Sequence, residues 1–284
     1  MSAAFAETPG SVTLTVTMLR GLAAEGVSPW LEGVPGFRPD RLHTAARRLG
    51  VRGLLCARPG TVAEARQLCD ALLPEAGLVA LPPAPEAGGD SPYCAARALA
   101  GAVDRPNLVV SLPATAEGLA ATARLLGEGT GVLCGPVTGP AAYEGLLDAW
   151  LCGLERAQDR ELDLAAIPAF AAVRIRPLGP AAAPVARRLY ARYEALLGTE
   201  RWRALARAGA RPHRLMWTAL GRRAAALPEL IGWGTAAALT PRAVDILPAL
   251  RGDTLTRVWP DSYASPHGSP HGVRRSLDPN RSGT

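Results

Sequence analysis

The chain has 284 residues, which is enough for one large domain or two small ones with a buried core and no disulfides. Apolar residues make up 48% and charged residues 20%, and no charge-free apolar run approaches membrane-spanning length, which excludes a transmembrane protein and a wholly disordered one. The formal net charge is +6, but the 31 basic residues are spread along the chain, which argues against a nucleic-acid partner.

Between residues 28 and 240, short apolar runs alternate with longer stretches of helical period. This alternation is typical of repeated βα units with a parallel sheet. About eight strands in about 250 residues predict a (β/α)8 barrel. In chain order, the predicted strands are 29–33, 51–57, 78–81, 108–112, 131–134, 169–175, 215–218 and 236–239.

Helices are predicted between these strands, at 61–73, 116–126, 141–158, 183–196 and 200–208. Thr61 and Glu64 have the spacing of a capping box at the start of the first of them. In the 141–158 helix, apolar residues recur at spacings of three and four and therefore form a packing face. These residues are Tyr143, Leu146, Leu147, Trp150, Leu151 and Leu154.

The chain divides into an N-terminal segment (1–19), the barrel (20–259) and a C-terminal tail (260–284). The N-terminal segment has no basic region before an apolar stretch, so no secretory signal is expected. The tail is rich in Ser, Pro, Gly and Arg and contains the repeat SPHGSPHG, so we expect it to be disordered. Its His267 and His271 lack Cys or carboxylate partners, so we expect no metal site.

Lysine is absent, because all 31 basic residues are arginine. A GC-rich coding sequence would explain this bias, but its chemical consequence is independent of its origin: no mechanism that needs a lysine amine is open to the chain. The five cysteines form no CxxC pair and have no metal-ligand spacing. They predict reduced, mostly buried thiols in a cytoplasmic protein.

Several segments together resemble one known family. They are GVSPWLEGV (26–34), RPNLVVSLPATAEGL (105–119), AYEGLLDAWLCGLERA (142–157), YEALLGTERWRALARAGARPHRLMWTALG (193–221) and LRGDTL (250–255). These segments resemble the transaldolase family, a class I aldolase-like barrel of the pentose phosphate pathway. The resemblance implies sugar-phosphate substrates and no cofactor. It also implies a lysine on the fourth strand that attacks the substrate ketone and forms a Schiff base.

The catalytic positions implied by the resemblance are altered. Ser111 stands where the family has its lysine, so we expect no Schiff base and no transaldolase turnover. Glu32 replaces an aspartate that acts as general acid and base, and its extra methylene shifts the carboxylate. Leu133 and Gly135 replace an asparagine and a threonine of the fifth strand.

The phosphate-binding positions implied by the resemblance are retained as Arg174 and Arg214. We expect the two guanidinium groups to converge on a phosphate at the carboxyl-terminal rim of the barrel, although both could be ordinary ion-paired arginines. His213, beside Arg214, is expected to be solvated. Cys56 and Cys134 are expected near each other at the mouth, either as small apolar residues or as a thiol site.

Three functions remain open from the sequence. The chain could be a non-catalytic transaldolase-like protein that senses or sequesters a sugar phosphate or another anionic small molecule. It could instead be an enzyme with lysine-independent chemistry, with Glu32 as acid and base and Arg174 and Arg214 as a clamp, or a structural subunit. The family's last helix is expected to be missing, which would expose Trp233 and Trp259 to a second copy or a partner protein. No membrane partner is expected.

Overall fold

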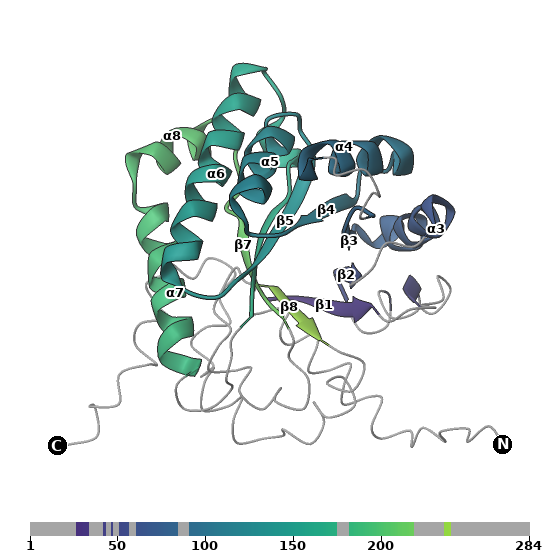
Figure 1. The fold of residues 1–284 in the computed structure, drawn as a ribbon, viewed down its shortest axis with the longest axis horizontal. Coiled ribbons are helices and arrows are strands. Elements are labelled where there is room, and N and C mark those ends of the chain that lie inside the picture. Colours follow the sequence, from purple (N-terminus) through teal and green to yellow (C-terminus); the bar gives the residue numbers. More distant parts are fainter. Residues whose placement is uncertain are drawn as a thin grey trace.

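The computed structural model describes residues 27–33, 42–43, 47, 51–56, 61–84, 91–174, 182–218 and 236–239. Its parallel strands form a closed barrel in chain order, because β8 pairs with both β7 and β1 (Figure 1). The predicted barrel is thereby confirmed. The strands are β1 (Ser28–Gly33), β2 (Gly53–Cys56), β3 (Leu78–Leu81), β4 (Leu108–Leu112), β5 (Gly131–Val137), β6 (Ala169–Val173), β7 (Arg214–Trp217) and β8 (Ala236–Leu239).

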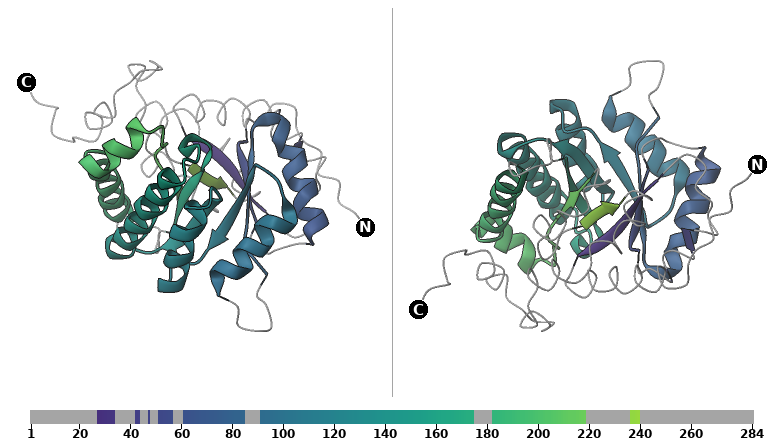
Figure 2. Two further views of the ribbon diagram at one scale, coloured as in Figure 1. Left: turned by 90° about the horizontal axis from the view of Figure 1, so that it is seen from above. Right: turned by 90° about the horizontal axis from the view of Figure 1, so that it is seen from below.

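Helices lie outside the strands that they connect (Figure 2). They are α3 (Val62–Leu72), α4 (Pro92–Val103), α5 (Ala116–Leu126), α6 (Pro140–Asp159), α7 (Ala182–Leu197) and α8 (Glu200–Arg207), with short 3₁₀ turns η1 (Leu73–Glu75) and η2 (Leu164–Ala166). The capping box of α3 is present, with Thr61 and Glu64 each bonded to the other's backbone. All six residues of the expected packing face on α6 are buried. The sequence prediction missed α4, which Ser91 caps by accepting a hydrogen bond from the Cys94 backbone.

Side chains alternate between the inside and the outside of the barrel along each strand. The larger apolar cluster fills the space between the strands and the surrounding helices. A smaller cluster fills the barrel interior and consists of Trp30, Ala80, Val109, Leu133, Phe170, Ala172 and Met216, with Leu55 and Leu78 packed against it. Trp30 and Phe170 meet edge to face in this interior cluster, with ring centroids 4.9 Å apart. The barrel is therefore a packed core rather than a pore.

Helices α6 and α8 are held together by ion pairs at the surface and by one aromatic contact. Arg201 of α8 donates hydrogen bonds to Asp148 (2.7 Å) and Glu155 (2.6 Å) of α6. Beside these two exposed ion pairs, the buried rings of Trp150 and Trp202 stack with centroids 5.0 Å apart. Because exposed ion pairs contribute little, most of the stability of this contact comes from the buried indoles.

His213 lies inside this helix layer, and the prediction that it is solvated is wrong. Its side chain is only 1% exposed and contacts the rings of Tyr143, Trp150 and Tyr193. The Tyr143 hydroxyl is hydrogen-bonded to Nε2 at 2.6 Å, while Nδ1 has no partner among the described residues. Burial lowers the pKa of His213 to about 3, so the imidazole is neutral at physiological pH.

Several expectations fall on residues that the structure does not describe. The segments 1–19 and 260–284 lie outside the described residues, and so do Trp233, Trp259, His267 and His271. Among the helices that are described, none combines the length and the apolar character that a membrane span requires.

Candidate functional site

Glu32 lies near the carboxyl end of β1 and belongs to the inner face of the barrel, because Trp30 two residues earlier is in the interior cluster. Its Oε2 is buried and has no hydrogen-bond partner among the described residues. Burial raises the pKa of Glu32 above its ordinary value, and the positive charge of Arg174 opposes this increase only in part. The carboxyl group is therefore poised to hold a proton at a higher pH than an exposed glutamate.

Ser111 occupies the corresponding inner position on β4, two residues after the interior Val109 and opposite Leu133 of β5. The Oγ atom is buried and, like Glu32 Oε2, has no partner in the described part of the chain. Buried polar atoms are normally hydrogen-bonded, so two unpaired ones at the same end of a barrel suggest a position for ligand atoms.

Arg174 directly follows β6 and is exposed at the same carboxyl end. Its backbone N–H donates to the Val137 carbonyl at 3.4 Å, which ties it to the end of β5. Arg174 and Glu32 lie at the same end of the barrel, and the positive charge of Arg174 acts to lower the pKa of Glu32. We call Glu32, Ser111 and Arg174 the mouth group.

Thr218 is a further polar residue at this end, which the sequence interpretation did not single out. It follows β7, is buried, and donates from Oγ1 to the Val173 carbonyl at 3.3 Å. Its position at the end of a predicted strand was the signal that could have identified it.

Arg214 lies at the opposite end of the barrel, so the expected convergence with Arg174 is wrong. Arg214 is the first residue of β7 and pairs with Phe170, whereas Arg174 lies four residues further along β6. At about 3.3 Å per residue, this separates the two positions by about 13 Å along the strands. Because the packed interior cluster lies between these two positions, one phosphate group cannot be held by both arginines.

Cys56 and Cys134 do not meet at the mouth, contrary to expectation. Both contact the outer apolar cluster rather than the interior one, and Cys134 Sγ lies 3.8 Å from the Pro113 carbonyl oxygen. Burial raises the pKa of both thiols to about 11. The two residues are therefore protonated packing residues at neutral pH, not a thiolate site.

The substitution Glu32→Gln tests the electrostatics of the mouth group. We expect the variant to gain up to about 1 kcal/mol over the wild type at pH 7, a small value because the carboxyl is partly exposed to solvent. Because the folded pKa is raised, the wild type loses stability as pH rises from about 4.5 through that pKa, whereas the amide does not titrate. Urea unfolding between pH 4 and pH 8 measures the free energies of unfolding of the variant and the wild type. If their difference does not increase with pH, this account is contradicted.

Comparisons with known proteins place these features in a family. A scan against protein-family models finds no match. A transaldolase of Thermobifida fusca is 36% identical over 191 residues, which cover 56% of this chain and 51% of the relative. A transaldolase of Acidothermus cellulolyticus is 35% identical over 198 residues, which cover 60% of this chain and 53% of the relative.

A longer match is found with a transaldolase of Parafrankia sp., which is 30% identical over 259 residues, or 77% of this chain and 70% of the relative. The chain spans about half the length of the first two relatives and more than two thirds of the third. With an eight-stranded parallel barrel and a match of this extent, the chain belongs to the transaldolase family.

Proposed function

We propose that this protein binds a sugar phosphate or another small anion at the carboxyl end of its barrel without forming a Schiff base. The observation that carries the proposal is the absence of lysine from the whole chain. Where the family resemblance places the lysine, the barrel presents the hydroxyl of Ser111, which has no hydrogen-bond partner in the described part of the chain. A hydroxyl can add to a carbonyl group but cannot form an iminium ion, and a guanidinium group does not lose its proton.

Anion binding at the mouth is supported by the charge and the hydrogen-bonding capacity of the mouth group. Arg174 is exposed and forms no salt bridge with any of the described residues, so its guanidinium group can donate to a phosphate. Glu32 Oε2 and Ser111 Oγ have no hydrogen-bond partner among the described residues and can bond to the hydroxyl groups of a sugar. This division of roles suits a compact ligand that is anionic at one end and hydroxylated at the other.

The role that follows is that of a non-catalytic partner in sugar-phosphate metabolism. We propose a pseudoenzyme related to the pentose phosphate pathway that works in the cytoplasm and senses or sequesters its ligand. In this proposal it acts as a homo-oligomer or together with a partner protein.

A second candidate is an enzyme with lysine-independent acid–base chemistry. The observation that favours it is the raised pKa of Glu32, because a carboxyl group that titrates closer to neutral pH is a more effective proton carrier. Turnover of a sugar phosphate that is lost in Glu32→Gln would favour this candidate over a binding protein.

Borohydride trapping tests the absence of a Schiff base. The protein is incubated with fructose 6-phosphate and sodium borohydride, and its intact mass is measured beside that of a transaldolase that retains the lysine. We expect the control to gain the mass of the reduced adduct and this protein to show no change, since it has no lysine. A stable adduct on this protein would refute the proposal.

Calorimetric titration with fructose 6-phosphate tests the mouth as the binding site. We expect Arg174→Gln to weaken binding about tenfold or more, because hydrogen bonds to charged groups contribute about 1.5–3 kcal/mol. No binding by the wild type, or equal binding by the variant, would exclude an anion site at the mouth.

A further inference from the structure

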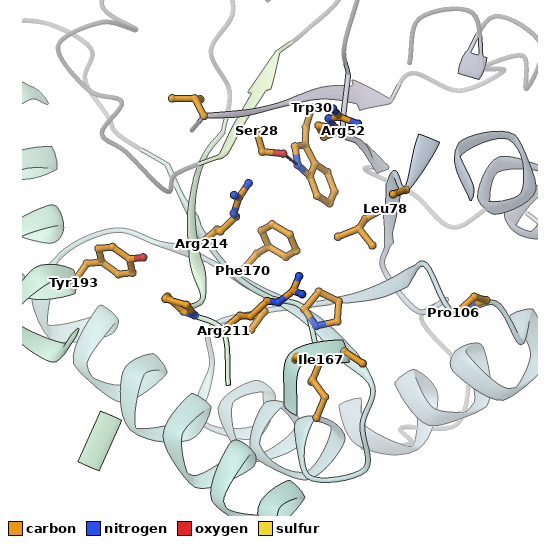
Figure 3. Close-up of a pocket in the computed structure, with 17 residues that line it drawn as sticks. Ser28, Trp30, Arg52, Leu78, Pro106, Ile167, Phe170, Tyr193, Arg211 and Arg214 are labelled. Atoms are coloured by element: carbon orange, nitrogen blue, oxygen red, sulfur yellow. Dashed lines mark hydrogen bonds between the residues drawn. The ribbon is translucent and has the colours of Figure 1, made fainter. Parts of the chain in front are cut away.

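A cavity of about 680 Å³ lies at the amino ends of the strands, opposite the mouth group (Figure 3). Ser28, Leu78, Ala169 and Arg214, which are the first residues of β1, β3, β6 and β7, all line it. Its volume falls within the range of small-molecule sites. No role for this end of the barrel follows from the proposed function.

Arg214 is the central charged group of the cavity. Figure 3 shows its side chain extending into the cavity, with Tyr193 on one side and Arg211 below it. Although the guanidinium group is half-buried, it forms no salt bridge with any described residue. Burial lowers the pKa of Arg214, and the like charge of Arg211 acts in the same direction. Two neighbouring cations without a counter-charge are an unfavourable arrangement that an anion would relieve.

Further donors line the same cavity. Arg52 donates from Nη1 to the Glu75 carbonyl at 3.2 Å, which leaves its other N–H groups available. Ser28 Oγ accepts a hydrogen bond from Trp30 Nε1 at 3.2 Å, so its own hydroxyl hydrogen can be donated. Among the described residues that line the cavity, none is Asp or Glu. The cavity thus presents three guanidinium groups and no carboxylate.

The remaining wall is apolar. Its accessible part comes from the partly buried Leu78, Pro168 and Ala169 and the exposed Pro106 and Pro212, whereas Trp30 and Phe170 are almost fully buried. A free inorganic ion would leave this apolar surface in contact with water, whereas an organic ligand would cover it. The combination of a cationic side and an apolar side suits a ligand with an anionic group on an apolar body.

We propose that this cavity binds an organic phosphate, with the phosphate group between Arg214 and Arg211 and the apolar portion against the wall that includes Leu78 and Pro168. Paired guanidinium groups favour phosphate because each donates two parallel hydrogen bonds to its oxygens. The site is separate from the mouth group and does not depend on the function proposed for it.

Calorimetry with phenyl phosphate on the full chain tests this site, with inorganic phosphate as the second ligand. We expect phenyl phosphate to bind more tightly than inorganic phosphate, because only the former covers the apolar wall. Arg214→Gln and Arg211→Gln should each weaken its binding about tenfold or more. Arg97→Gln, at an exposed position of α4 that belongs to neither site, is the matched control and should change the dissociation constant less than about twofold. Arg174→Gln is measured as well, because it reports whether phenyl phosphate binds at the mouth.

Each contrary outcome has a distinct meaning. If the wild type does not bind phenyl phosphate, or if both cavity variants bind it unchanged, the cavity site is refuted. Binding that is lost only in Arg174→Gln would place the ligand at the mouth, which refutes this inference and supports the proposed function. Because Arg211 is exposed and precedes β7, its variant decides the question even if Arg214→Gln fails to fold.

Discussion

Acidification from pH 7 to pH 4 is expected to lower the free energy of unfolding by about 3 kcal/mol through His213 alone. The folded pKa of His213 is about 3 and its ordinary value is 6.5. Between these values the unfolded chain binds a proton that the folded chain excludes, so stability falls as pH falls. The physical cause is burial, because the aromatic cluster around His213 keeps water away from the charged imidazolium form.

Urea unfolding at pH 7, 6, 5 and 4 measures this effect. His213→Gln removes the titrating group and should reduce the loss of stability across this range by about 3 kcal/mol, although the variant starts from a lower stability because it leaves the cluster less well packed. His43→Gln is the matched control, because His43 is only partly buried and bonds to the Ala71 carbonyl through Nδ1. If His213→Gln loses as much stability as the wild type, a different group is responsible.

Gly118→Ala is expected to destabilise the fold by about 1–3 kcal/mol, although alanine is normally the better helix former. Gly118 lies in the first turn of α5, and a Cβ atom there would lie 1.9 Å from the Pro113 carbonyl oxygen. The clash is with backbone, so the loop between β4 and α5 must move. Ser111 lies two residues before Pro113, so the substitution should also disturb the mouth.

Gly101→Ala in α4 is the matched control, because a Cβ atom at Gly101 would meet nothing within 4 Å. We expect this change to stabilise the protein by up to about 1 kcal/mol. Urea unfolding of the two variants at one pH gives the comparison. Equal effects of the two substitutions on the free energy of unfolding would show that the loop moves away from the new Cβ atom at position 118 without loss of stability.

The barrel could be predicted from the sequence because the apolar runs and the helical stretches alternate regularly. The bounds of β3, β4, β8 and α5 agree with the prediction. Helix α4 was missed because its Ala-rich sequence shows little difference in hydrophobicity between its buried and exposed faces. Only Tyr93, Ala96 and Val103 are buried. The start signal was present, since Ser91 caps the helix and Pro92 occupies its first position.

The site was harder to predict because strands that are buried on both faces do not reveal which side chains point inward. Cys134 and Leu133 are adjacent apolar residues, yet Leu133 lies inside the barrel and Cys134 outside. His213 was misjudged because the rings that bury it come from α6 and α7, which lie far from it in the sequence and which no local sequence pattern can indicate.

The position of Arg214 could have been read from the order of residues. It precedes the predicted strand at 215–218, and in a parallel barrel the residue before a strand lies at the amino end. Arg174 follows the core of its strand and lies at the carboxyl end. The family resemblance suggested a shared phosphate, and the chain direction of the strands shows that this pairing is wrong.

The filled interior of the barrel makes it a partition between two solvent-facing ends. Trp30, Val109, Leu133, Phe170 and Met216 occupy the space between the mouth group and the arginine-lined cavity, so no solute can diffuse from one to the other. A molecule taken up on one side must leave by the same side. Each end therefore equilibrates with its own surroundings, and any communication between the two would have to pass through shifts of these packed side chains.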